Sequence, residues 1–352
     1  MDPADVVSLP MTKPFIDVNS YHAYGLSIIQ TSPENSLAWI MMNYIQLYGV
    51  PDSTNGDFIH FTTSSHFSDI PRSYVSRLHI DDVYKFFPNI VDFVMDRIRD
   101  GHYVNTILDE YYIPGTRAYG KYPFTHNILI HGFDRKKGVF QAAGYWNKPA
   151  VYAFGRNIPF KAFEQAFRNI APISQYMNQT FEMIRYPYDS NRYIDAAFNI
   201  DVIKAFLLDY LEGKPHIERD PKRIRFVYGT KVYGLLTDML VKQLNAPEGC
   251  HLIHLKTLQT IVNHKQMMAQ RVNYLLREGW IRRKSSTAGC AGVQDSAENI
   301  HNIFAKYIWN KDKALLERMI VRTNDLVQKE RAFIEALLED ITTGGVHRAR
   351  FR

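Results

Sequence analysis

Cysteine is nearly absent from this chain of 352 residues, which contains only Cys250 and Cys290. Two cysteines provide no disulfide framework, and their spacing matches no metal-binding motif, which is typical of a protein in the reducing cytoplasm. Long apolar segments are also missing, both after a basic start and at the length of a membrane span. We therefore expect a cytoplasmic protein with no membrane partner.

Several motifs of known chemistry are missing too. The chain has no phosphate-binding glycine loop, no H-E-x-x-H helix and no G-x-S-x-G elbow, and its 13 histidines are scattered. We therefore expect no bound cofactor and no metal. The net charge of +6 is mild, and no nucleic-acid motif accompanies it. An acidic carrier protein or a phosphorylated ligand fits this charge equally well.

The composition is that of a globular protein, with 46% hydrophobic and 22% charged residues. The 22 tyrosines and 21 phenylalanines fit a ligand-lined cleft or an aromatic core equally well. The periodicity predicts an α+β protein. We expect a region of helices and antiparallel strands over residues 1–188, followed by a mostly helical region over residues 189–352.

Particular elements follow from periodicity and from start and stop signals. The N-terminal region is predicted to contain a helix from Ser20, an amphipathic helix from Pro33 to Gly49, strands over His126–His131 and Val139–Tyr145, and an edge strand at Thr180–Tyr186. In the C-terminal region we expect a helix closed by Gly213, helices over Val232–Leu244 and from Leu255 to near Gly279, and a last helix or helix pair. A stretch rich in Gly, Ser and Ala, Ser285–Gly292, is expected to interrupt the helices.

Ser20 is the first candidate for chemistry, because Asn19-Ser20 precedes a segment with helical spacing. The free N–H groups and the positive dipole end of a helix N-terminus stabilise an oxyanion beside a nucleophile. An ordinary N-cap serine would look the same in the sequence.

His126 is the second candidate, because it opens a strand after a tyrosine-rich loop. A histidine at a strand edge can reach a helix N-terminus and act as its base, although a structural histidine is the alternative. His22 is a rival base, but a helical residue usually points away from the residue two before it. Asp109-Glu110 ends the preceding strand, where a carboxylate could orient an imidazole, bind an ammonium group or cap a turn. Asn147 could orient His126 or form a turn.

Three segments together resemble the butirosin biosynthesis protein H type of acyltransferase, which is similar to papain-like cysteine peptidases. They are Asn19–Ala23 at a helix start, Leu108–Pro114 (LDEYYIP) at a strand end, and Thr125–Asp134 (THNILIHGFD), a histidine-led strand with a glycine-aromatic-aspartate turn. The resemblance covers roughly the first half of the chain. It implies a papain-like fold in which the nucleophile-bearing helix packs on an antiparallel sheet.

The resemblance also implies a reaction. A carrier protein, acyl or peptidyl, presents an acyl group as a phosphopantetheine thioester, the group moves to residue 20, and an amine acceptor then takes it to form an amide. The chain departs from the family in two places, with Ser20 where the family has cysteine and Gly144 where related enzymes carry an aspartate. Ser20 is either the natural residue or a replaced cysteine. Because a serine hydroxyl beside a lone histidine is a much weaker nucleophile than a thiolate, we expect the chain to be slow or inactive. The expected third catalytic residue is Asn147, or else Asp109.

The expected substrate-binding residues are Tyr111, Tyr112 and His22. The basic residues Arg282, Arg283 and Lys284 are expected to meet an acidic carrier. A peptidase or thioesterase would use the same residues with water as the acceptor. A non-catalytic relative that binds carrier proteins or peptides is the third alternative, and in it Ser20 is a loss of the nucleophile. The long apolar-faced helices of the C-terminal region also allow a homodimer.

Overall fold

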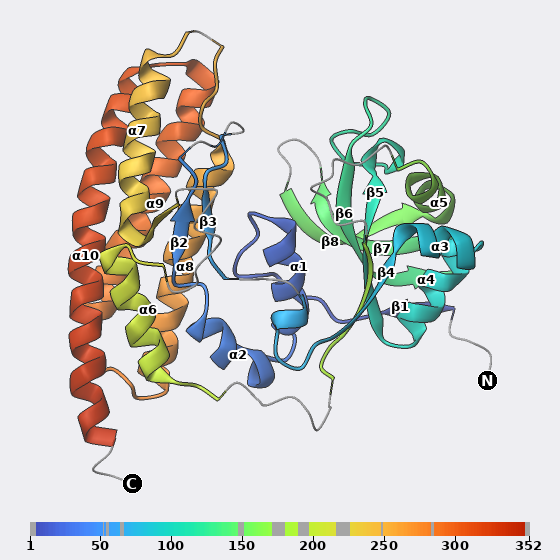
Figure 1. Cartoon of the computed structure of the whole chain (residues 1–352), viewed down its shortest axis with the longest axis horizontal. Helices are drawn as coiled ribbons and strands as arrows, with labels where there is room; N and C mark the ends of the chain where they lie inside the picture. Colours follow the sequence, from blue (N-terminus) through green and yellow to red (C-terminus); the bar gives the residue numbers. More distant parts are fainter. Residues whose placement is uncertain are drawn as a thin grey trace. The chain divides into compact units, whose positions relative to one another are not determined.

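The computed structural model describes residues 5–51, 53, 56–63, 67–146, 151–170, 180–188, 197–215, 226–247, 249–282 and 285–348. The fold is mixed α+β, with an antiparallel sheet and a helical C-terminal region (Figure 1). The chain forms two compact units, Met1–Leu37 with Ser65–Asp195, and Ala38–Ser64 with Ala196–Arg352. The segment 38–64, which the sequence analysis placed in the first region, therefore belongs to the second unit.

The first unit is built on a seven-stranded sheet with the order β4-β9-β5-β6-β7-β8, in which β1 also pairs with β6. All pairs are antiparallel. The strands are β1 (Val6–Ser8), β4 (Tyr74–His79), β5 (His102–Asp109), β6 (Thr125–Asp134), β7 (Val139–Trp146), β8 (Val151–Pro159) and β9 (Thr180–Arg185). The expected strands at His126 and Val139 are confirmed. The expected edge position of 180–186 is wrong, because β4 pairs with the outer side of β9.

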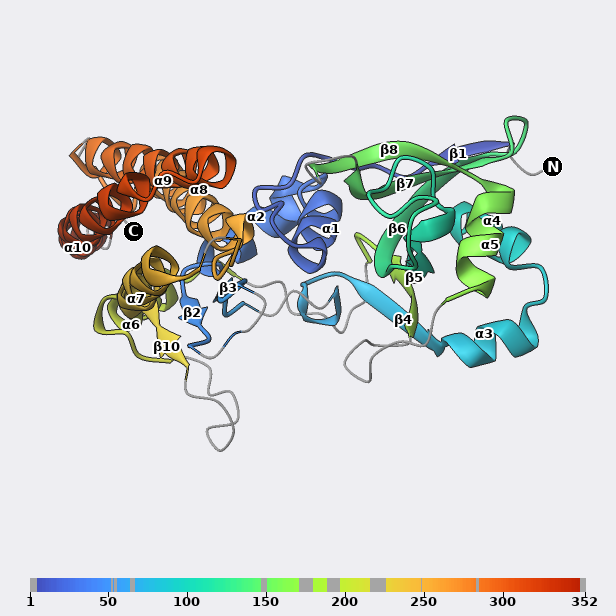
Figure 2. The ribbon, with the colours of Figure 1, turned by 90° about the horizontal axis from the view of Figure 1, so that it is seen from above.

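Helices cover both faces of this sheet. The structure contains α1 (Ser20–Ile29), α3 (Ile80–Phe86), α4 (Ile90–Arg99), α5 (Phe160–Arg168) and the short turns η1 (Phe67–Asp69) and η2 (Glu110–Tyr112). Figure 2 shows α4 and α5 on one face of the sheet and α1 on the other. Phe163 and Phe167, one turn apart on α5, are buried against Phe140 and Phe181 of the sheet. Burying one such ring stabilises the fold by about 1.5–3 kcal/mol.

The helix α2 (Pro33–Met42) is shorter than the sequence predicts, because it ends seven residues before Gly49. Tyr44 adopts a left-handed φ of 53°, and its N–H donates to Thr63 Oγ1 (2.9 Å) instead of a helical carbonyl. The chain then enters β2 (Leu47–Gly49), which pairs with β3 (Ile59–Phe61). Apolar residues at helical spacing thus lie partly on a strand here, because strand pairing overrides the periodicity.

The described part of the second unit combines the small sheet β10-β2-β3 with several helices. These elements are β10 (Val227–Tyr228), η3 (Gly229–Lys231), α6 (Ile200–Glu212), α7 (Val232–Asn245), α8 (Leu255–Arg277), α9 (Ser285–Asn310) and α10 (Ala314–Arg348). The helix closed by Gly213 is confirmed, with Gly213 in the left-handed conformation (φ 64°) that favours glycine at a helix end.

The expected interruption at 285–292 is wrong, because this stretch forms the first turns of α9. A Cβ atom on Gly289 would lie 3.4 Å from the ring of Phe333 on α10. Ser286 Oγ donates to the carboxylate of Asp340, also on α10. Small residues here let two helices approach closely, and this packing outweighs the low helix propensity of Gly and Ser.

Candidate functional site

Ser20 lies at the N-terminus of α1, as the sequence predicts. Asn19 is the cap residue in extended conformation, and its carbonyl accepts from His22 N–H (3.1 Å) and Ala23 N–H (2.9 Å). The Asn19 side chain caps none of the helix N–H groups, and its Nδ2 donates to Tyr21 Oη (3.3 Å) instead. The positive end of the α1 dipole therefore carries no side-chain cap from Asn19 where Ser20 lies.

Two tyrosines fix the start of α1 to the sheet. Tyr24 lies one turn after Ser20 on the same helix face, and its hydroxyl donates to the carbonyl of Asn127 on β6 (2.6 Å). The hydroxyl of Tyr145 on β7 donates to the carbonyl of Asp17 (2.6 Å), three residues before Ser20. The helix face that carries Ser20 is thereby tied to the residue that follows His126.

Burial raises the pKa of Tyr24, Tyr145 and Tyr152 above the usual value for a phenol, so all three remain protonated donors at neutral pH. The hydroxyl of Tyr152 on β8 shares a hydrogen bond of 2.7 Å with Ser27 on α1. Neutral hydroxyl groups thus attach α1 and the residues just before it to β6, β7 and β8, and these attachments do not depend on a charge.

His126 lies beside a buried carboxylate. Its Nδ1 is 3.3 Å from Glu110 Oε1, and the side chains of His126 and Glu110 are 27% and 5% exposed. The two groups are placed as an ion pair, although Nδ1 lacks the alignment of a hydrogen bond. The imidazole ring also meets Tyr145 edge to face at 6.2 Å. A nearly buried acid thus lies next to a partly exposed imidazole.

The two adjacent acids at the end of β5 have different roles. Asp109 Oδ1 accepts from the backbone N–H groups of Tyr111 and Phe124, both at 2.9 Å, so it closes the loop between β5 and β6. Glu110, which the sequence analysis considered only together with Asp109, is the acid that lies against His126. Asp109 is the last residue of β5 and Glu110 is the first residue of η2, and their side chains have different partners.

The remaining expected residues lie in different environments. His22 is fully buried and packs beside Tyr21, with ring centroids 4.3 Å apart. Tyr111 is exposed, and Tyr112 meets it edge to face at 5.0 Å while packing on the core. Their substrate-binding roles stay predictions. Asn147, Arg283 and Lys284 lie outside the described residues, whereas Arg282 is exposed.

Gly144, where related enzymes carry an aspartate, lies on β7 near the anchor of α1. A Cβ atom there would lie 3.7 Å from Tyr24 Oη and 3.6 Å from the Trp146 ring, both ordinary contacts. Trp146 also lines a cavity of about 320 Å³, together with Pro114, Gly115, Arg156 and Asn157. The loop that carries Glu110 thus also borders a cavity.

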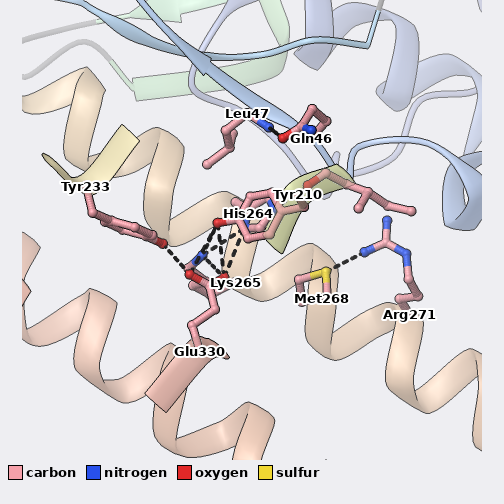
Figure 3. Close-up of polar contacts among 10 residues, drawn as sticks. Gln46, Leu47, Tyr210, Tyr233, His264, Lys265, Met268, Arg271 and Glu330 are labelled. Atoms are coloured by element: carbon pink, nitrogen blue, oxygen red, sulfur yellow. Dashed lines mark hydrogen bonds and ion pairs between the residues drawn. The ribbon is translucent and has the colours of Figure 1, made fainter. Parts of the chain in front are cut away.

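A second polar cluster lies inside the second unit (Figure 3). Lys265 on α8 forms an ion pair with Glu330 on α10, and its Nζ lies 3.3 Å from Tyr210 Oη and 2.9 Å from His264 Nδ1. Tyr233 Oη donates to Glu330 Oε2 at 2.6 Å. No member of the cluster is more than 1% exposed, so we assign it to stability.

Burial determines the charges in this cluster. It lowers the pKa of His264 far below its usual value, so this imidazole is neutral, and His264 Nε2 is hydrogen-bonded to the carbonyl of Ile45 (2.7 Å). Burial also lowers the pKa of Lys265, while the charge of Glu330 opposes that shift. The positive charge of buried Lys265 is therefore stabilised by the negative charge of Glu330.

The chain matches no protein-family model, and no curated protein shows significant similarity to it. Within the part of the chain that the structure describes, no helix has both the length and the apolar character needed to cross a membrane. The described residues also contain no group of three or more His, Cys, Asp or Glu side chains placed to hold a metal ion.

Proposed function

We propose that this protein is an amide-forming acyltransferase that takes its acyl group from a phosphopantetheine thioester on a carrier protein, as in natural-product biosynthesis. The observation that carries the proposal is the tie between α1 and β6. Tyr24, on the helix face of Ser20, binds the carbonyl next to His126, and His126 lies 3.3 Å from Glu110. The proposed nucleophile, base and acid thus come from the start of α1, the start of β6 and the residue after the end of β5, which pairs with β6.

A papain-like arrangement is consistent with this placement. In such proteins the nucleophile begins a helix that packs on an antiparallel sheet, and the histidine lies at the start of a neighbouring strand. Here α1 begins at Ser20 and packs on β7, while His126 is the second residue of β6. The agreement concerns where Ser20 and His126 lie on the secondary structure. It supports the proposal in addition to the resemblance of the three sequence motifs.

The proposed reaction has two steps. Ser20 Oγ attacks the thioester carbonyl while His126 takes the hydroxyl proton, and the pantetheine thiol leaves with that proton as the acyl-serine ester forms. The acceptor amine then attacks the ester, His126 takes a proton from the amine, and Ser20 leaves with it as the amide forms. The positive end of α1 stabilises the oxyanion in both steps.

Glu110 gives a serine nucleophile the support that a lone histidine lacks. A serine hydroxyl remains protonated at neutral pH and needs a base whose positive charge is stabilised, as in Ser-His-Asp and Ser-His-Glu arrangements. Glu110 is buried and within ion-pair distance of the His126 imidazole. We therefore propose that Ser20 itself reacts, and that cysteine at position 20 would react faster.

The carrier protein would meet positive charge close to the site. Arg117 and Lys121 are exposed on the loop between β5 and β6, whereas both acids of that loop, Asp109 and Glu110, are buried. The outward charge of the loop is therefore positive, which complements an acidic carrier surface. Arg282 is a further exposed cation, on the second unit.

The test uses an acidic carrier protein loaded with a butanoyl thioester. The natural chain, Ser20→Cys and Ser20→Ala are incubated with it, and the intact mass of each protein is followed with and without an amine acceptor. We expect one acyl group on the natural chain and on Ser20→Cys, none on Ser20→Ala, and an amide once amine is added. Ser32→Cys is the matched control, because Ser32 also precedes a helix and is similarly half-buried.

The outcomes separate the alternatives. Free acid instead of amide, whatever amine is offered, would indicate a thioesterase or peptidase that uses the same residues. Binding of the loaded carrier without acylation of either nucleophile would indicate a non-catalytic relative. Equal acylation of Ser20→Cys and Ser32→Cys would show that any half-exposed thiol reacts, and would refute the assignment of the site.

A further inference from the structure

The loop between β5 and β6 exposes four aromatic side chains. Tyr111, Tyr119, Tyr122 and Phe124 are each between 37% and 49% exposed. We refer to these four residues as the aromatic surface. Aromatic rings contribute most to a fold when they are buried, so four half-exposed rings within fourteen residues indicate that something else covers them.

The loop that carries the aromatic surface is folded on itself. Gly120 N–H donates to the carbonyl of Tyr111 (3.0 Å), and Glu110 N–H donates to the carbonyl of Phe124 (2.9 Å). Thr116 Oγ1 donates to the carbonyls of Glu110 and Ile113, each at 2.9 Å. These bonds join the two ends of the loop and its middle, so the rings are presented by a compact segment.

The aromatic surface adjoins the catalytic candidates directly. The ring of Phe124 stacks on the imidazole of His126, with centroids 5.8 Å apart and planes 19° apart. Tyr122 meets Phe124 edge to face at 6.5 Å. In the proposed reaction His126 exchanges a proton with Ser20 Oγ and with the leaving thiol, so it acts next to the bound thioester. Phe124, which stacks on His126, therefore borders the region in which the thioester reacts.

We propose that the aromatic surface binds a planar or aromatic acyl group of the donor thioester and makes the enzyme selective for such donors. This inference rests on the proposed function. The chain of the acyl group is attached directly to the reacting carbonyl, and Phe124 stacks on His126, the proposed base that acts beside that carbonyl. A protonated amine is disfavoured there because Arg117 and Lys121 give the loop a positive outward charge. Stacked or edge-to-face rings would stabilise a bound acyl ring.

The test compares two donors with similar, unconjugated carbonyl groups, 3-phenylpropanoyl-pantetheine and butanoyl-pantetheine. Acylation of Ser20→Cys by each is measured as kcat/KM by intact mass, and repeated with Phe124→Ala and Tyr122→Ala added. We expect the phenyl donor to be favoured about tenfold, the factor that corresponds to about 1.4 kcal/mol for one stacked pair. Phe124→Ala and Tyr122→Ala should each reduce this preference, measured as the ratio of the two kcat/KM values within one variant.

Tyr74→Ala is the matched control, because Tyr74 is 41% exposed but lies on β4 at the far edge of the sheet. It should change neither rate. Equal rates for the two donors, or a preference that survives both loop variants, would refute the aromatic surface while leaving the acyltransferase proposal intact.

A binding measurement keeps the two proposals separate. The amide analogue of 3-phenylpropanoyl-pantetheine cannot transfer its acyl group easily, and its binding to the natural chain is measured by calorimetry. Binding that Phe124→Ala weakens about tenfold supports the aromatic surface even if no acylation occurs. Binding that is unaffected by both loop variants would refute it.

Discussion

Replacing Glu330 with glutamine should destabilise the second unit by several kcal/mol, because it isolates the charge of Lys265. Glu330 accepts from Lys265 and from the hydroxyls of Tyr210 and Tyr233, and both members of the ion pair have side chains only 1% exposed. Glutamine keeps the shape and one acceptor oxygen but removes the negative charge. Removing one partner of a buried pair costs about 3–5 kcal/mol.

The structure also sets an upper limit on this cost. A lysine left without its partner can lose its proton, and at pH 7 that costs about 5 kcal/mol, since its ordinary pKa is 10.5 and each pH unit is worth about 1.36 kcal/mol. The limit falls to about 2 kcal/mol at pH 9. In Glu330→Gln the folded pKa of Lys265 lies below the unfolded value, so the unfolded state binds more protons and relative stability rises with pH.

The assay is urea unfolding of the natural chain and Glu330→Gln at pH 7 and pH 9, followed by circular dichroism. Glu335→Gln is the control on the same helix, because Glu335 pairs with Arg331 at 3.1 Å but both side chains are more than half exposed. It should change the free energy of unfolding by less than about 0.5 kcal/mol. Lys265→Met combined with Glu330→Gln should recover most of the loss. A loss below about 1 kcal/mol, or one that does not shrink with pH, would refute the reasoning.

Three further predictions concern the first unit. Glu110→Gln should slow acylation of residue 20 about tenfold or more, measured by intact mass, because the imidazolium loses its acid; an unchanged rate would remove Glu110 from the mechanism. Reversing both Arg117 and Lys121 to glutamate should lower kcat/KM for a loaded carrier about tenfold but not for free acyl-pantetheine, and equal losses would contradict carrier docking at the loop. Burial lowers the pKa of His131 to about 4, so between pH 6.5 and pH 4 the unfolded state binds a proton that the folded state does not. The free energy of unfolding should therefore fall by about 3 kcal/mol over this pH range. His131→Gln should reduce this acid-induced loss, as measured by urea titration.

The sequence predicted the strands around His126 and the helix start at Ser20 because both carry local signals. Asn19-Ser20 is a start signal, and the residues of β6 and β7 are mostly apolar or small. The predictions are wrong where contacts between residues distant in the sequence determine the secondary structure. The helix from Pro33 was extended to Gly49 because Tyr44 and Leu47 keep helical spacing, whereas pairing with β3 turns that segment into a strand.

The candidate site was only partly predictable, for a geometric reason. Asp109 and Glu110 are neighbours with the same chemistry, and the sequence does not reveal which one faces His126. The structure separates them because Asp109 Oδ1 binds two backbone N–H groups of the loop, while Glu110 lies in the following turn and faces the imidazole. Which of the two side chains faces His126 depends on the hydrogen bonds of the loop. One of these bonds joins Asp109 to Phe124, fifteen residues later in the chain.

The interleaving of the two units has a consequence for synthesis on the ribosome. The second unit's early segment hydrogen-bonds to residues made much later, as in the contact of Ile45 with His264, which are 219 positions apart, and that of Gly56 with Thr257. At about 5–20 residues per second, the early segment waits roughly 10–40 s for these partners. During that time β2 and β3 lack β10 and α8, so the nascent chain exposes an unpaired apolar hairpin between parts of the first unit. Conditions that slow translation of this middle region should lengthen that exposure.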